Sequence, residues 1–162
     1  MQNMARAESQ PVEARLVAEY LAVRFPNATT RQHVRLGPIK PFMSTEDLTP
    51  AERALAGVWR RWADAVVIED TRVVIVEGSV YPDPGLISQL DLYLRLWPAT
   101  PEYAQYARTP VVGLLLTALD DPTIRQLAAE RGHLCAVYRP PWADGYLLTQ
   151  YARRQRSPTA GL

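Results

Sequence analysis

Residues 63–79 read ADAVVIEDTRVVIVEGS, which is two apolar runs rich in valine and isoleucine on either side of a short polar break. β-Branched residues favour strands, because they pack well on a pleated surface. The break at Asp70-Thr71 is short enough for a tight turn. The stretch therefore predicts two antiparallel strands, Ala63–Glu69 and Arg72–Val80, joined as a hairpin at the centre of the fold.

Outside the hairpin, the spacing of apolar residues predicts further helices and strands. The expected helices cover residues 9–25, 50–60, 86–97, 100–108 and 120–131, and the expected further strands cover residues 29–36, 110–117 and 134–138. Because a helix separates the last two strands, they should run parallel through a crossover connection. We therefore expect an α/β fold, with a mixed sheet of a central antiparallel hairpin plus parallel strands, flanked by helices.

The length and composition indicate a single globular domain followed by a basic tail. A chain of 162 residues fits one domain, and 48% hydrophobic with 22% charged residues excludes a disordered or fibrous protein. The longest apolar run, Val111–Leu119, is shorter than the ~20 residues of a membrane span. The first residues do not resemble a secretory signal. We therefore expect an intracellular protein that does not act at a membrane.

The open end of the hairpin carries two acids, Asp64 on the first strand and Glu77 on the second. If the turn is symmetric, they lie directly opposite each other with Cβ atoms about 5 Å apart. Two such carboxylates repel unless a cation neutralises them, and Mg²⁺ binds one or two carboxylates plus water and phosphate oxygens. The spacing therefore indicates a divalent-metal site that can polarise a phosphodiester. The alternative is that one carboxylate points to solvent or meets an arginine such as Arg60 or Arg61.

The hairpin resembles the core of the PD-(D/E)XK nuclease superfamily. In that superfamily an acid on one strand, and an acid-X-lysine sequence on the next, build the metal site. Asp64 matches the first acid and Glu77 the second. The resemblance implies a restriction-endonuclease-like fold and hydrolysis of DNA phosphodiester bonds with Mg²⁺ or Mn²⁺ held by these two residues.

The resemblance extends to the neighbouring helices and covers residues 9–139. Gln89 and Tyr93 are similar to the Gln-X-X-X-Tyr motif of the superfamily's exonuclease-like branch, which implies that they orient the substrate strand. Residues four apart share a helix face, so both side chains can point at the hairpin, although they fit a polar core contact equally well. An acid on the first helix is also usual, and Glu13 or Glu19 fills that place.

The sequence departs from the superfamily at Ser79, where the family has its lysine. A serine hydroxyl donates one neutral hydrogen bond and cannot replace the positive charge, and losing such a group typically costs ~10²–10³-fold in rate. Lys40 is the only lysine, and it lies in a proline-rich stretch. We therefore expect a degenerate nuclease fold that is non-catalytic or weakly active. The alternative is an active nuclease in which Lys40 or an arginine replaces the missing lysine.

The resemblance also bears on partners. Compact nuclease-like proteins of this pattern resemble phage-encoded ones, which implies a virion or DNA-packaging component, located in the cytoplasm or the virion, with protein partners in a larger assembly. The tail at residues 140–162 contains Arg153, Arg154 and Arg156, with no acid after Asp144. These arginines are candidates for binding DNA, since local positive charge attracts a polyanion. The alternatives are a solvated tail with at most a helical turn over 146–155, and a DNA-binding module without chemistry.

The remaining candidate residues are expected to be structural. His33 and His133 are interpreted as surface or strand residues, and the single cysteine, Cys135, as a small buried hydrophobe that excludes an intrachain disulfide. The tryptophans are interpreted as core or interface anchors, with base stacking as the minor alternative. They are Trp59, Trp62, Trp97 and Trp142. The sequence contains no glycine-rich phosphate loop, so nucleotide hydrolysis is not expected.

Overall fold

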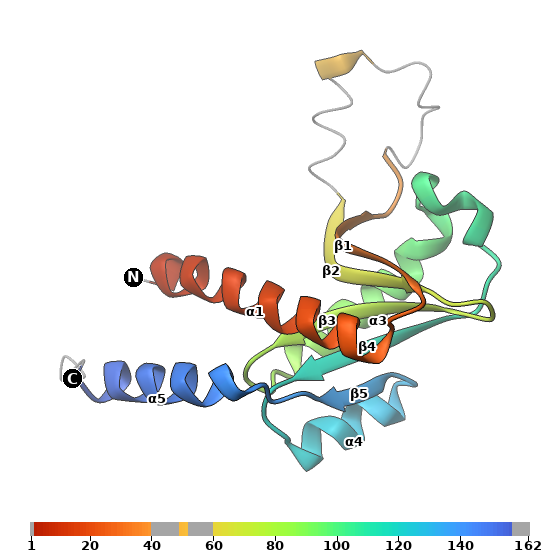
Figure 1. Ribbon diagram of the computed structural model, residues 1–162. Helices are drawn as coiled ribbons and strands as arrows, with labels where there is room; N and C mark the ends of the chain where they lie inside the picture. The colour runs from red at the N-terminus through yellow and green to blue at the C-terminus, as the bar shows by residue number, and fades with distance from the viewer. Residues whose placement is uncertain (1, 40–48, 52–59, 157–162) are drawn as a thin grey trace.

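The computed structural model describes residues 2–39, 49–51 and 60–156, with side chains from residue 11 onward (Figure 1). The chain is an α/β protein with a five-stranded mixed sheet, as predicted. The helices are α1 (Gln2–Arg24), α3 (Gly85–Leu96), α4 (Pro122–Glu130) and α5 (Pro141–Arg156), with short 3-10 turns at Trp97–Ala99 and Pro101–Tyr106. The strands are β1 (Thr29–Leu36), β2 (Arg61–Ile68), β3 (Val73–Ser79), β4 (Val111–Thr117) and β5 (Leu134–Val137).

The strands lie in the sheet in chain order, β1-β2-β3-β4-β5. The first three strands pair antiparallel, while β3, β4 and β5 run parallel, with α3 and α4 as the crossover helices. The β2–β3 hairpin has the predicted symmetric register, with Ile68 opposite Val73 and Ala65 opposite Val76. The two β-branched runs therefore predicted the hairpin correctly, and the assumption of a symmetric turn predicted its register.

The sheet separates two hydrophobic clusters. Strand residues such as Ile75 and Leu115 pack against α3 and α4 on one face, together with the fully buried Leu90. On the other face, Val74 and Leu116 pack against α1 and α5. Helices α1 and α5 run side by side, so that the start of α1 and the end of α5 lie on the same side of the molecule (Figure 1).

Three local expectations need correction. The segment from residue 140 is not an irregular tail with one helical turn but a 16-residue helix, α5. Its proline start and basic last turn are favourable helix ends, and they stabilise a longer helix than the composition suggested. The histidine His133 is not a surface residue, because its side chain is fully buried and its Nε2 lies 2.8 Å from Asp91 Oδ1. Helix α1 begins at Gln2 rather than residue 9.

Two candidate residues, Lys40 and Trp59, lie outside the described residues, as does most of the helix expected over 50–60. Within the described part of the chain, no helix is both long enough and apolar enough to span a bilayer.

Candidate functional site

The acids predicted to form the site lie where the hairpin strands separate. Pairing between β2 and β3 ends at Ala65 and Val76. Beyond that point β2 continues along β1 as far as Arg61, while β3 continues along β4 as far as Ser79. Such a fork leaves backbone groups of both strands without partners in the sheet, so they must be satisfied by side chains, water or a ligand.

The side chains of Asp64 and Glu77 bridge this fork. The Gly78 N–H donates a hydrogen bond to Asp64 Oδ2 at 2.8 Å, and the Asp64 N–H donates one to Glu77 Oε1 at 3.2 Å. Glu77 is buried and Asp64 is half-buried. The structure therefore brings the two predicted acids together, one residue beyond the last regular pair of the hairpin.

Both carboxyl groups are shifted toward their protonated forms. Burial raises the pKa of Glu77 to about 8, and repulsion from the Asp64 carboxylate adds to the rise. Burial also raises the pKa of Asp64, although the hydrogen bond from Gly78 partly offsets it. Glu77 therefore holds its proton at neutral pH, when no cation is bound, because two buried negative charges in one place are costly.

The third acid of the site comes from α1. The Ser79 hydroxyl donates a hydrogen bond of 3.4 Å to Glu13 Oε1, and the charge of Glu13 also raises the pKa of Glu77. The other candidate, Glu19, lies elsewhere on α1 and accepts hydrogen bonds from Trp142 Nε1 and Arg15. Of the two helix acids considered, the structure therefore places Glu13 at the fork.

Helix α3 contributes one of its two predicted residues. Tyr93 is buried, its hydroxyl donates a hydrogen bond of 2.7 Å to the Trp62 carbonyl, and burial together with the neighbouring Glu77 raises its pKa. Gln89, one turn earlier, has an exposed side chain. The hydrogen bond of Tyr93 therefore connects α3 to the fork. The alternative interpretation of Tyr93 as a polar core contact predicts the same bond. Gln89, by contrast, is not buried.

The donor set suits a hard divalent cation bound largely through water. Asp64 and Glu77 are oxygen ligands, which Mg²⁺ and Mn²⁺ prefer, and Mg²⁺ commonly uses only one or two carboxylates. Among the described residues, no group of three or more His, Cys, Asp or Glu side chains converges as a ready-made metal site. Ion pairs within residues 11–39, 49–51 and 60–156 involve neither Asp64 nor Glu77. The two acids therefore fit a cation as their neutraliser.

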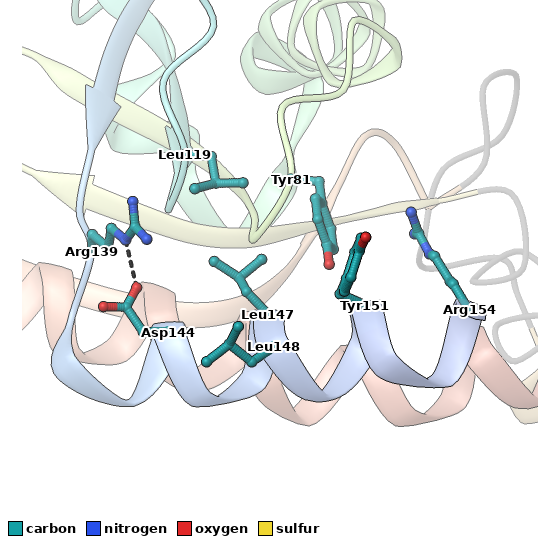
Figure 2. Close-up of a pocket in the computed structure, with 8 residues that line it drawn as sticks. All are labelled: Tyr81, Leu119, Arg139, Asp144, Leu147, Leu148, Tyr151 and Arg154. Atoms are coloured by element: carbon teal, nitrogen blue, oxygen red, sulfur yellow. Dashed lines mark hydrogen bonds and ion pairs between the residues drawn. The ribbon is translucent and has the colours of Figure 1, made fainter. Parts of the chain in front are cut away.

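The predicted arginines lie on the last turn of α5, near the chain that follows the end of β3. Arg153, Arg154 and Arg156 are exposed, and the Arg154 guanidinium lies 5.3 Å from the centre of the Tyr81 ring. Tyr81 follows Ser79 by two residues, so this helix end approaches the chain that leaves the fork. A pocket of about 480 Å³ lies here, and Figure 2 shows the side chains that line it. Its lining residues are Tyr81, Leu119, Arg139, Asp144, Leu147, Leu148, Tyr151 and Arg154.

A feature that the sequence did not predict lies on the other side of Asp64, at His33. In β2, Ala63 packs in the α3 cluster and Ala65 in the α1 cluster, although residues two apart on a strand normally share a face. The opposite residue of β1, His33, has a left-handed backbone with φ of 54°. Both strands are therefore irregular at this position. No pattern in the residues around His33 indicates this irregularity.

No protein-family model matches the sequence, and no curated protein matches it.

Proposed function

We propose that this chain is a degenerate member of the PD-(D/E)XK nuclease superfamily, which binds a divalent cation and associates with DNA but hydrolyses it weakly or not at all. The observation that carries the proposal is the acid pair at the strand fork, Asp64 and Glu77, beside a serine that is hydrogen-bonded to Glu13. The α/β sheet with its central hairpin supports the same relationship.

Cation binding follows from the electrostatics of the acid pair. Two partly buried carboxyl groups with raised pKa values, without a cationic side chain in ion-pair contact among the described residues, gain most from a divalent ion. Asp64 and Glu77 would hold it. When bound, Mg²⁺ or Mn²⁺ supplies Lewis-acid polarisation of a phosphate oxygen. Binding must displace the proton of Glu77, so affinity should rise with pH.

Weak catalysis follows from the residue at the lysine position. The Ser79 hydroxyl is uncharged and already donates to Glu13, so it adds no positive charge where a phosphodiester would develop negative charge. With Ser79 in place of the lysine, the site lacks the positive charge that the superfamily pattern places beside its acids. The expected loss is ~10²–10³-fold in rate relative to a site with the lysine.

An association with DNA, as a structural or packaging component of a phage-like assembly, is the role we propose for such a protein. The three arginines at the end of α5 support it, because no acid accompanies them from residue 145 onward. Replacing Arg153, Arg154 and Arg156 by alanine should weaken DNA binding and lower its salt dependence, since each lost phosphate contact reduces the salt slope by about one. Binding that is unchanged in this triple variant would remove the arginines from the proposal.

Calorimetric titration with Mn²⁺ tests the cation site. Wild type should bind Mn²⁺ at pH 8 more tightly than at pH 6, and Asp64→Asn should abolish binding. Asp70→Asn is the matched control, because Asp70 is an exposed acid at the turn of the same hairpin. If Asp64→Asn binds Mn²⁺ as wild type does, the fork is not a metal site and the superfamily assignment loses its main support.

A DNA-cleavage assay with Mn²⁺ separates the degenerate protein from the active alternative. We expect little or no cutting by wild type or Ser79→Ala, a gain of cutting in Ser79→Lys, and loss of that gain in Ser79→Lys combined with Asp64→Asn. Rapid Mn²⁺-dependent cutting by wild type, lost in Asp64→Asn, would instead establish an active nuclease whose positive group comes from elsewhere in the chain.

A further inference from the structure

The planar side chains of His33, Trp62 and Arg35 form a cluster on the exposed surface beside the acid pair. The rings of His33 and Trp62 are stacked, with centroids 3.9 Å apart and planes 11° from parallel, and the Arg35 guanidinium lies 4.5 Å from the centre of the same indole. His33 and Arg35 therefore both pack on the indole of Trp62. His33 and Arg35 are exposed, and Trp62 keeps 42% of its surface accessible.

The backbone is distorted at His33, within this cluster. Pairing between β1 and β2 runs on both sides of residue 33 with one register but omits the pair His33 and Asp64. His33 is the one residue other than glycine with positive φ among the described residues. A left-handed residue typically costs roughly 1–2 kcal/mol. Strain of this kind is retained where it aims a side chain, and here it accompanies an imidazole stacked on Trp62.

A hydrogen bond and two residues of β2 connect this cluster to the fork. The Trp62 carbonyl accepts the hydrogen bond from Tyr93, which lies beside Glu77, and Trp62 precedes Asp64 by two residues on β2. Because two residues of a strand span about 7 Å, a ligand bound to this cluster would lie next to the acid pair.

We propose that His33, Trp62 and Arg35 form a stacking platform that holds an unpaired base and its phosphate from a single-stranded nucleic acid, adjacent to the acid pair. The inference rests on the proposed function and names its substrate class. An exposed imidazole, indole and guanidinium that already pack together are groups on which a nucleobase can stack. A duplex keeps its base faces covered, so the platform selects a single strand. Arg35 supplies the charge for the phosphate.

Binding is measured by fluorescence anisotropy with a labelled 12-nucleotide oligo-dT in EDTA, so that the result does not depend on the metal site. Trp62→Ala, Arg35→Ala and His33→Gly should each weaken binding about 5- to 100-fold, the range expected from losing one stacked base. His33→Gly is informative because glycine relieves the left-handed strain, so this variant should be at least as stable as wild type while binding less well.

Matched controls and competitors decide the outcome. Arg24→Ala removes another exposed guanidinium that lies over an aromatic ring, that of Phe25, and should bind like wild type. An abasic strand and a duplex of the same length should bind more weakly than oligo-dT. Equal binding by the abasic strand or the duplex, unchanged binding by folded His33→Gly and Trp62→Ala, or full competition by an acidic peptide would overturn the platform. Mn²⁺ titration reports the acid pair separately, so either site can fail without the other.

Discussion

Glu77 is the residue whose chemistry depends most on its surroundings. It stands on a strand in an otherwise apolar run, and the fold buries it next to a second acid and near a third. An isolated buried carboxylate would be costly, so the group either keeps its proton or takes a cation. The same residue thus links the stability of the protein to pH and the affinity of the site to metal.

Stability should therefore fall as the pH rises from about 5 to 8. The folded state keeps the Glu77 proton to a pKa of about 8, whereas the unfolded chain releases it near its ordinary value of 4.5. Between these values the unfolded state binds fewer protons, so unfolding becomes easier by up to about 1.4 kcal/mol per pH unit. Urea unfolding of wild type and Glu77→Gln at pH 5 to 8 measures this.

The free energy of unfolding of Glu77→Gln should depend less on pH than that of wild type, because glutamine has no titratable proton. Asp70→Asn should show the same pH dependence as wild type. Saturating Mg²⁺ should also flatten the wild-type slope by replacing the proton. Parallel slopes for wild type and Glu77→Gln would mean that Glu77 ionises in the folded protein near its ordinary pKa.

Single residues also mark the limit of inference from sequence. The pairing of Asp64 with Glu77 was predictable because a hairpin with a short turn fixes which residues meet. The left-handed backbone of His33 was not, since nothing in a local pattern encodes a break in strand alternation. The burial of His133 depends on Asp91, which is 42 residues away in the chain.

At the scale of elements, the strands were more predictable than the last helix. The strands rich in valine and isoleucine were recognisable from their composition, and their relative direction follows from whether a turn or a helix joins them. Helix α5 follows Pro140 and contains Gly145, and it is held against α1 by a hydrogen bond from Trp142 to Glu19 across 123 residues. That contact is tertiary, so composition alone predicted an irregular tail.

The close approach of α1 to β3 gives a prediction at this scale. A Cβ added at Gly78 would lie 2.5 Å from Val17 Cγ2, so Gly78→Ala forces helix and strand apart next to the acid pair. Overpacking of this kind costs about 1–3 kcal/mol. Urea unfolding measures the loss, and Gly145→Ala is the control. Gly145 lies in α5 with open space around its Cα, so alanine there should stabilise by about 0.5–1 kcal/mol.

A double-mutant cycle identifies the cause of the loss. Combining Gly78→Ala with Val17→Ala should cost clearly less than the sum of the single changes, because the smaller side chain removes the clash. Additive losses would place the effect of Gly78→Ala in the strand backbone rather than at the helix contact.

At the scale of the whole molecule, one sheet serves two hydrophobic clusters, and this should make unfolding a single event. Leu16 on α1 and Leu90 on α3 are both fully buried, on opposite faces of the sheet. Leu16→Ala and Leu90→Ala should each cost about 2–5 kcal/mol, and the double variant should lose the sum within about 0.5 kcal/mol.

The measurement is chemical unfolding followed by two signals, far-UV circular dichroism for the helices and tryptophan fluorescence, to which the buried Trp97 on the α3 face contributes. Each variant should give coincident transitions by both signals, because strands β2, β3 and β4 carry residues of both clusters and cannot lose one face alone. If Leu16→Ala shifts only the dichroism and leaves the fluorescence transition in place, α1 unfolds independently of the sheet. Glu13 would then be an optional third acid of the fork, and metal affinity should survive the loss of α1 packing.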